Sequence, residues 1–493
     1  MRRTLATAPI AGLVFVVVLT LAAIAVRNGL IGDDALRLWA GASTAADGQE
    51  PMGRIVAAYP TLPFLTSTLV AWLTPADTPA PALVAAGLLA LIAAFCFQGF
   101  RKAGLPEASA AIACLLIAFH PALLRAVVTG PADMFLAVFL LMLCLALYDL
   151  RARSGTSEVM AVGLVLMAVA FSHPMGAALS FAAVLFLAFA VRPTLVANSA
   201  LNVVVALIFP TLFAISAFTY VSWVFPGDGW SFLAAPAASM SAWTVAQSHL
   251  FGEPLSKVLV LDASFAMAVA LVLGAPVAVF FLARVYRRRP LVDPALVFVA
   301  AAIAATALGI LSGFFGDPSA LVVAAPVLAA VVLMRVPLAR ERHILALALL
   351  LLGWFGGLGG VMLVDPATVG ELHAALDRGG GERMDALTAG NAARRDGVLA
   401  DIDNAPIFVL GRGRANGIYG PESEPFALAM LFDRIDTPFV AVPDPQSPIG
   451  AGDRLNKAFP SLFHEGLAGY RVIYQNNTWR LFGRIKDLVN SKD

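Results

Sequence analysis

Residues 344–363 read ILALALLLLGWFGGLGGVML, twenty consecutive positions without a charged side chain. An α-helix rises about 1.5 Å per residue, so about 20 apolar residues cross the roughly 30 Å hydrocarbon core of a bilayer. The chain repeats this pattern along most of its length: 60% of its 493 residues are hydrophobic and 13% are charged, whereas about a quarter of a soluble domain is charged. The sequence therefore predicts a polytopic α-helical membrane protein.

The apolar windows predict about eleven transmembrane helices. We expect the first to remain as an anchor, because its apolar core is longer than that of a typical signal peptide. The predicted spans are 7–26, 79–99, 107–127, 132–150, 157–172, 176–192, 198–224, 257–283, 292–313, 318–334 and 344–363.

Lysine and arginine collect at alternate ends of these spans. Cytoplasmic loops retain such residues, so we expect the N-terminus in the cytoplasm. The predicted cytoplasmic ends hold Arg2, Arg3, Arg101, Lys102, Arg151, Arg153, Arg192, Arg284, Arg287, Arg288, Arg289, Arg335, Arg340 and Arg342. With an odd number of spans, everything after residue 363 is expected outside the cytoplasm.

The composition divides the chain into a multi-pass membrane domain at 1–363 and a soluble domain at 364–493, which contains about half of the charged residues. Alternating short elements predict an α/β fold for the second domain, which has the usual size of a domain. Strands are expected at Ala405–Leu410, Pro438–Val442 and Tyr470–Tyr474, and helices around 368–402, 424–434 and 453–466. External loops are expected at 27–78 and 225–256, the latter holding Trp230, Trp243, His249 and Glu253.

Carboxylates stand at the outer ends of two spans. Asp33 and Asp34 follow the first span directly. Two adjacent carboxylates at a bilayer surface repel each other, so we expect at least one of them to have a binding partner or a catalytic role. Asp133, in the sequence Thr-Gly-Pro-Ala-Asp, opens the fourth span. The alternative in both places is a helix cap, which at Asp33 or Asp34 would start a surface helix over 35–45.

Taken in order, these motifs resemble the GT-C superfamily of polyprenyl-phosphate-sugar glycosyltransferases. That superfamily includes protein O-mannosyltransferases and the bacterial lipid A aminoarabinose and core galacturonic acid transferases. The resemblance covers roughly residues 1–220. It rests on the acidic pair, on Asp133, on the proline-punctuated re-entry Tyr59-Pro-Thr-Leu-Pro63, on His120-Pro121, and on Phe171-Ser-His-Pro-Met-Gly176.

The resemblance implies catalytic roles for three carboxylates. Asp33 matches the general base that accepts the proton of the acceptor hydroxyl, Asp34 its acidic neighbour, and Asp133 a second functional carboxylate that organises the donor. Tyr59 stands where the aminoarabinose enzymes have a lysine, so other groups must hold the donor phosphate. The candidates are Arg54, Arg125, His173, Arg412 and Arg414.

The implied reaction is an inverting sugar transfer at the outer face of a bacterial inner membrane. The donor would be a polyprenyl-phosphate sugar, and the acceptor a lipid, a polysaccharide or a protein. A single displacement needs one base and cations on the phosphate. No metal is required, although the acidic groups could hold a divalent ion. No basic block suggests nucleic-acid binding.

Several alternatives remain open from the sequence. The protein could be a transporter or flippase, although no internal repeat is visible, or a scaffold with an external binding domain. Asp262 could be functional or could snorkel to the interface. Leu410–Gly417 could be a glycine-permissive turn or an arginine face toward the site. The three cysteines, Cys96, Cys114 and Cys144, are expected to be packed thiols.

Overall fold

The chain folds into two compact units, which are described separately. The computed structural model describes residues 7–27, 32–48, 52–75, 78–153, 155–191, 193–225, 257–286, 293–312, 315, 317–335, 342–366, 381–413, 416–421 and 423–490. The first unit, here the helical bundle, comprises Met1–Ala22, Val56–Pro63 and Ala82–Glu371. The second, here the C-terminal unit, comprises Ala23–Ile55, Phe64–Pro81 and Leu372–Asp493. Of the predicted loop at 225–256, the part after residue 225 lies outside the described residues.

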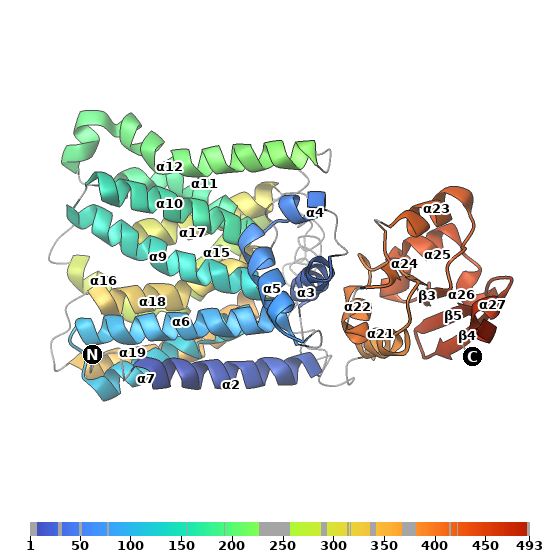
Figure 1. The fold of residues 1–493 in the computed structure, drawn as a ribbon. Helices are drawn as coiled ribbons and strands as arrows, with labels where there is room; N and C mark the ends of the chain where they lie inside the picture. The colour runs from blue at the N-terminus through green and yellow to red at the C-terminus, as the bar shows by residue number, and fades with distance from the viewer. Residues whose placement is uncertain are drawn as a thin grey trace. The chain divides into compact units, whose positions relative to one another are not determined.

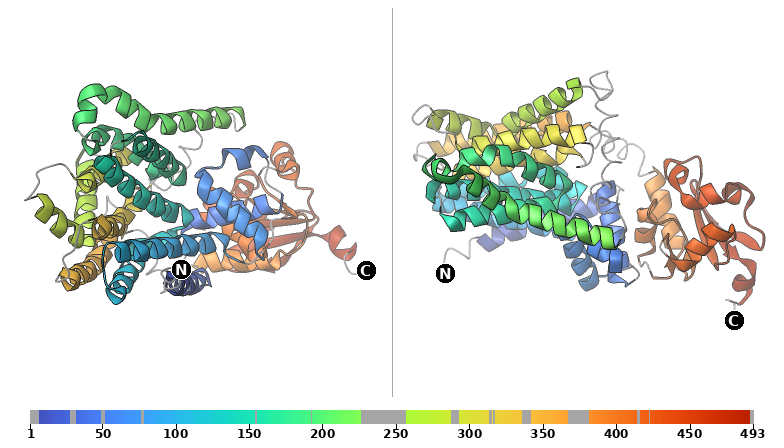
Figure 2. Two further views of the ribbon diagram at one scale, coloured as in Figure 1. Left: turned by 60° about the vertical axis from the view of Figure 1, so that its left-hand side comes forward. Right: turned by 90° about the horizontal axis from the view of Figure 1, so that it is seen from above.

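The helical bundle consists of apolar helices, among which α9, α10 and α18 run side by side (Figure 1). In the right-hand view of Figure 2, most helices of the bundle again lie along one direction. Its elements are α2 (Thr7–Arg27), α6 (Ala80–Lys102), α7 (Glu107–Ala118), α8 (Pro121–Thr129), α9 (Pro131–Arg153), α10 (Thr156–Ser172), α11 (Pro174–Ala190), α12 (Pro193–Val224), α15 (Lys257–Gly274), α16 (Pro276–Tyr286), α17 (Pro294–Ser312), the 3₁₀ helix η1 (Pro318–Val323), α18 (Ala324–Arg335) and α19 (His343–Val364).

Proline sets where many of these elements begin. The N–H at the first position of a helix has no hydrogen-bond partner within the helix, so proline, which lacks this N–H, loses nothing there. The ring of proline also fixes φ near the helical value, which is why proline is common at this position. Seven elements of the bundle start in this way, at Pro121, Pro131, Pro174, Pro193, Pro276, Pro294 and Pro318. The same residues interrupt the apolar runs, which is why two predicted spans are broken.

All eleven predicted windows fall on helices, but not all of these helices have the length of a span. In the described part of the chain, seven helices are long and apolar enough to cross a membrane. The number rises to nine if each bent pair is one span: α7 and α8 meet at 47°, and α15 and α16 at 83°. The protein is thus mainly helical, with the build of a multi-pass membrane protein, while eleven spans stays a prediction.

A row of glycines on α19 lets the backbone of α15 approach closely. A Cβ at Gly356 would lie 2.1 Å from the Leu273 carbonyl oxygen, and one at Gly353 would lie 2.8 Å from that of Gly274. A Cβ at Gly360 would lie 3.2 Å from Ala270 Cα. Small residues at this spacing are typical of close helix pairs in membranes. They pack α19 against the end of α15, where the chain bends into α16.

The C-terminal unit is built on a mixed five-stranded sheet of order β2-β1-β3-β5-β4. β1 pairs in parallel with β2 and β3, whereas β5 is antiparallel to β3 and β4. The strands are β1 (Val398–Leu399), β2 (Ile418–Tyr419), β3 (Phe439–Pro443), β4 (Tyr470–Gln475) and β5 (Trp479–Arg484). The helices are α21 (Gly381–Ala392), α22 (Pro406–Arg412), α23 (Glu424–Phe432), α24 (Pro448–Gly452), α25 (Arg454–Ala458), α26 (Leu462–Glu465) and α27 (Ile485–Asn490).

Strict alternation along the strands gives this sheet two buried faces. In β3, Phe439 and Ala441 join one apolar cluster, and Val440 and Val442 join the other. Successive side chains of a strand point to opposite faces, so both faces must be covered. The first face is covered by helices that include α22 and by α3 (Asp33–Ala46), and the second by helices that include α23, α25 and α26.

Helix α3 therefore belongs to the C-terminal unit, although the sequence placed it in a loop of the membrane domain. Leu36, Trp39 and Ala40, at helical spacing, are buried in the same cluster as Phe408 and Trp479. Burial of these three side chains removes the apolar stripe of α3 from water. This explains why α3 packs against residues more than 350 positions later in the sequence. The remaining helices of the first external segment are α4 (Met52–Ala57) and α5 (Thr61–Leu73).

The sequence predicted part of the C-terminal unit correctly. The strands at Pro438–Val442 and Tyr470–Tyr474 are confirmed as β3 and β4, and the helix around 424–434 as α23. The strand predicted at Ala405–Leu410 is wrong, because this segment forms α22. A short, fully buried apolar run has no periodicity that separates a strand from a helix, and Pro406 favours a helix start. Strands β1, β2 and β5 were missed.

A buried charged network in the helical bundle

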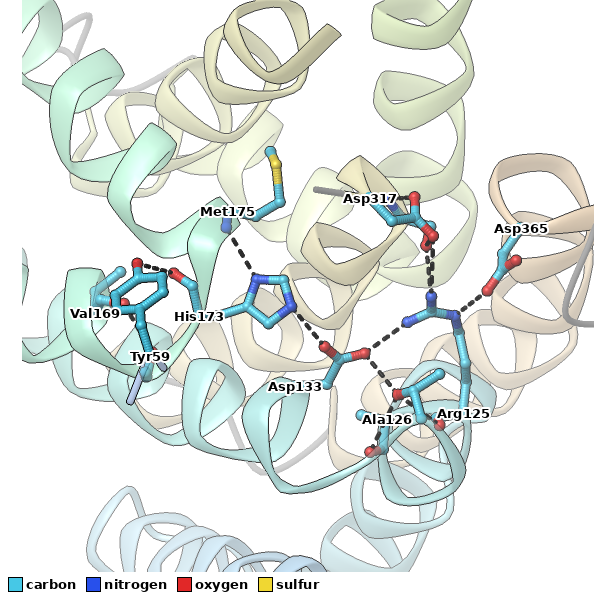
Figure 3. A network of polar contacts seen from close by, with 12 residues as sticks. Tyr59, Arg125, Ala126, Asp133, Val169, His173, Met175, Asp317 and Asp365 are labelled. Atoms are coloured by element: carbon cyan, nitrogen blue, oxygen red, sulfur yellow. Dashed lines mark hydrogen bonds and ion pairs between the residues drawn. The ribbon is translucent and has the colours of Figure 1, made fainter. Parts of the chain in front are cut away.

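Helix α8 and the start of α9 place Arg125 and Asp133 face to face. Gly130 joins the two helices with φ 134°, a conformation that only glycine adopts easily. The resulting turn brings Asp133, in the first turn of α9, within 2.8 Å of Arg125 Nη1. The Thr129 hydroxyl donates to the same Asp133 oxygen at 2.6 Å. Both charged residues are buried, and Figure 3 shows their side chains pointing toward each other.

Arg125 also contacts two carboxylates from distant parts of the bundle. Its Nε donates to Asp365 Oδ2 at 2.5 Å, and its Nη2 lies 3.7 Å from Asp317 Oδ2. The same Nη2 donates to the Ser319 hydroxyl at 2.5 Å. Asp365 ends α19 and Asp317 caps η1. One guanidinium is thus shared by three carboxylates, which leaves an excess of negative charge at this point when all three are ionised.

His173 holds the other oxygen of Asp133. It is the N-cap of α11, where its Nδ1 accepts the N–H of Met175 at 3.0 Å, and its Nε2 lies 3.0 Å from Asp133 Oδ1. Because Nδ1 is an acceptor, the neutral ring carries its hydrogen on Nε2 and donates it to the carboxylate. Both oxygens of Asp133 are therefore occupied, and the carboxylate is fixed between Arg125 and His173.

His120 repeats this arrangement at the head of α8. Its Nδ1 accepts the N–H of Ala122 at 3.2 Å, and its Nε2 lies 3.3 Å from Gly274 O and 3.2 Å from Gly353 O. The break after α15 frees backbone acceptors that a membrane cannot hydrate. His120 satisfies one of them and so ties α8 to the α15–α16 bend.

Tyr59 brings the proline-punctuated segment to the same network. Its hydroxyl donates to Ala170 O at 2.7 Å, at the end of α10, and lies 3.5 Å from His173 O. Its ring packs against Phe171 and Phe218. The structure thus brings together four of the predicted site residues, namely Tyr59, Arg125, Asp133 and His173 (Figure 3).

The other predicted site residues lie elsewhere or outside the described part. Asp33 and Asp34 occupy the first turn of α3, and Gly32 is the N-cap. The capping alternative is therefore wrong about the cap, but the helix that it predicted over 35–45 is confirmed as α3. Asp34 is exposed, while the side chains of Asp33 and Arg54 and the whole of Arg414 are outside the described residues. Arg412 is buried, and its Nη2 donates to Arg395 O at 2.9 Å and to Asp396 Oδ1 at 3.2 Å.

The capping alternative is also wrong for Asp133, since α9 begins two residues earlier and the carboxylate bonds to side chains. Sequence reasoning missed Asp317 and Asp365. Each adjoins the end of an apolar span, which is the signal that singled out Asp133. Burial, and after it the Asp365 carboxylate, raises the pKa of Asp317, so this carboxyl can hold a proton nearer to neutral pH than an exposed aspartate.

The described residues contain no group of three or more histidines, cysteines and acids arranged to hold a metal ion. The three cysteines are buried and unpaired, as predicted. No family model matches the chain, and no match was found among the curated proteins or the solved structures. The candidate site is therefore defined by its own residues and geometry: a buried network of charges inside a bundle of apolar helices.

Replacing Gly357 with Ala is expected to disturb this network from a distance. The new Cβ would lie 2.3 Å from His120 Cε1 and 2.4 Å from Nε2. The imidazole is held by three hydrogen-bond partners and cannot move without uncapping α8. We expect the free energy of unfolding to fall by about 1–3 kcal/mol, measured by thermal unfolding in detergent.

Gly359 provides the matched control on the same helix, because a Cβ there would meet nothing within 4 Å. Alanine at position 359 should be neutral, or stabilising by up to about 1 kcal/mol through helix propensity. Equal stability of the two variants would show that His120 is not held as described.

Proposed function

We propose that this chain is a GT-C-type membrane glycosyltransferase that moves a sugar from a polyprenyl-phosphate donor to a lipid, polysaccharide or protein acceptor. One observation carries the proposal. Tyr59, Asp133 and His173 come from three separate motifs of the family resemblance, and they are linked through hydrogen bonds into one network. Residues that only capped the starts of their own helices would not be expected to bond to one another across helices.

The proposed reaction is a single displacement. Asp33 accepts the proton of the acceptor hydroxyl, whose oxygen attacks the anomeric carbon as the bond to the phosphate oxygen breaks. Polyprenyl phosphate leaves as a stabilised anion, and the anomeric centre inverts. Asp133 is better placed as an organiser than as a base, because Arg125, Thr129 and His173 already occupy its oxygens.

The phosphate of the donor needs cations. Arg125 is already shared by three carboxylates, so its main role in the proposal is to hold Asp133 and the network. Arg54 and Arg414 remain the candidates for direct phosphate contact, with Arg412 and His173 as further candidates. Tyr59 is proposed to line the donor site while anchoring the segment around it.

The test is transfer by the purified protein. The lipid that co-purifies with it should be identified by mass spectrometry, and a polyprenyl phosphate or its sugar ester is expected to be enriched over an unrelated membrane protein from the same cells. The matching donor should then be consumed with release of polyprenyl phosphate. Absence of both enrichment and turnover would rule out the proposal.

Topology gives a separate prediction. Arginine asymmetry and an odd number of spans place the C-terminus outside the cytoplasm of a bacterial inner membrane. A C-terminal alkaline phosphatase fusion should be active and a C-terminal GFP fusion dark. A control fusion after Arg153, at a predicted cytoplasmic end, should behave in the opposite way, and the same result at both positions would contradict the assigned orientation.

A transporter or flippase is the second candidate, favoured by two observations. Bent helix pairs, such as α15–α16 with its 83° break, and charged side chains buried in a bundle are both common in transporters. Proteoliposomes separate the two functions. A flippase would move the sugar lipid across the bilayer without breaking the bond between sugar and phosphate, whereas the glycosyltransferase would break it.

A further inference from the structure

Two buried aspartates meet at the start of α25 in the C-terminal unit. Asp453 is the N-cap of this helix, and its Oδ1 accepts the N–H of Asn456 at 2.9 Å. Asp401, just after β1, reaches the same turn, where its Oδ2 accepts the N–H of Arg454 at 2.9 Å. The Asp401 carboxylate therefore joins the loop after β1 to the first turn of α25, which the Asp453 carboxylate caps.

Three oxygens around this turn have no hydrogen-bond partner among the described residues. They are Oδ1 of Asp401, Oδ2 of Asp453 and Oδ1 of Asn456, and their residues are only 3%, 1% and 6% exposed. The amide of Asn456 is oriented by its Nδ2, which donates to Pro443 O at 2.9 Å and to Gly450 O at 3.3 Å. The unpartnered atom is therefore an oxygen, and each such buried acceptor costs about 1–3 kcal/mol or more.

The charges are unbalanced as well. In the part of the chain that the structure describes, neither Asp401 nor Asp453 forms an ion pair. Of the neighbouring cations, Arg454 pairs with Asp403 at 3.4 Å, and Lys457 donates to Gly452 O at 3.1 Å. The charge of Lys457 favours the ionised form of Asp453 but forms no ion pair with it. A buried charge without a partner is costly, and burial raises the pKa of Asp453 to about 7. The two carboxylates are therefore stabilised either by a bound cation or by a proton on one of them.

We propose that Asp401, Asp453 and Asn456 bind a divalent cation of the calcium type. Calcium prefers carboxylate and amide oxygens and completes its coordination with backbone carbonyls and water. A single ion would neutralise both carboxylates and satisfy all three oxygens. One shared proton would satisfy only the carboxylate pair, and would leave one negative charge and the amide oxygen of Asn456 unsatisfied.

This proposal is independent of the proposed transfer reaction. The ion would join the loop after β1 to α25, and so stabilise the C-terminal unit. Weak affinity is expected, because the side chains supply only two carboxylates and one amide oxygen, and weak calcium sites have dissociation constants of about 10⁻⁴–10⁻³ M. At a hundredfold excess of calcium over that constant, the midpoint of thermal unfolding of this unit should rise by about 5–10 °C.

The experiment uses the full chain in detergent, freed of metal with a chelator and then titrated with CaCl₂. Calorimetry should show one site, and hydrogen exchange should show protection gained at 398–405 and 453–459. Asp401→Asn and Asp453→Asn keep the acceptors of the Arg454 and Asn456 N–H groups, and asparagine is a good N-cap. Both variants should bind calcium at least about tenfold more weakly.

Asp403→Asn is the matched control, since that carboxylate lies in the same loop but pairs with Arg454 at the surface. It should bind calcium like the unmodified chain. No calcium binding by the unmodified chain, or protection gained elsewhere, would overturn the proposal even if a variant failed to fold. Stability that rises only as the pH falls, with no response to calcium, would overturn it in favour of a proton shared by the two carboxylates.

Discussion

Sugar transfer by the Asp33→Asn variant is expected to be at least about 100-fold slower than by the unmodified chain. General acid–base groups contribute about 100- to 10,000-fold in rate, and asparagine keeps the size of aspartate but not its basicity. Folding should be unaffected, because α3 is held by Leu36, Trp39 and Ala40, which are buried in an apolar cluster. Initial rates with a polyprenyl-phosphate-sugar donor measure the effect.

Two further measurements make this result specific. Donor affinity should change little, because the base contacts the acceptor and not the phosphate. Asp34→Asn should have a milder effect, since this exposed neighbour is proposed to position the base. If Asp33→Asn transfers sugar at near the unmodified rate, Asp33 is not the base and Asp34 is the next candidate. If neither substitution slows transfer, neither carboxylate is the base, and the role assigned to the acidic pair fails.

The second large effect concerns stability. Replacing Arg125 with Met should lower the free energy of unfolding by about 3–5 kcal/mol, because Asp133 and Asp365 would remain buried without their cation. Asp317 would lose its nearest positive charge as well. The expected result is a large drop in the yield of folded protein and in its midpoint of thermal unfolding.

Arg335 offers the matched control. It pairs with Asp149 at 2.9 Å, but both side chains are more than a third exposed, at 35% and 40%. Exposed pairs contribute about 0–1 kcal/mol, so Arg335→Met should be nearly neutral. Adding Asp365→Asn to Arg125→Met should recover part of the loss, because one unpaired charge is removed. Equal stability of the two single variants would contradict the assigned role of Arg125.

The bundle could be predicted from sequence because each of its helices follows a local rule. Apolar runs of about 20 residues mark the helices, and prolines such as Pro121 and Pro276 mark where they break. The apolar run at 257–283 predicts one span, whereas the structure bends this segment by 83° before α16. Eleven spans and the orientation of the chain remain predictions.

The candidate site could be predicted only in part, for a physical reason. Asp133, His173 and Tyr59 lie in motifs, and the motifs identified them. Asp317 and Asp365 contact Arg125 although they lie 192 and 240 positions away from it in the sequence. The spacing of neighbouring residues cannot predict contacts over such separations. Likewise, the alternative of a surface helix over 35–45 located α3, but an amphipathic pattern does not say which surface covers its apolar side.

The glycine row of α19 has a consequence for how the protein is made. Residues 257–286 leave the ribosome well before residues 343–364, so the bend between α15 and α16 enters the membrane without the surface against which it packs. Until α19 is made, the carbonyl of Gly274 does not pack against Gly353. His120 likewise has only one of its two acceptors, because Gly353 O is absent. Helix α19 therefore completes the packing of helices that are made before it. Nascent chains that stop before His343 would have an incomplete bundle, and we expect membrane quality control to degrade them.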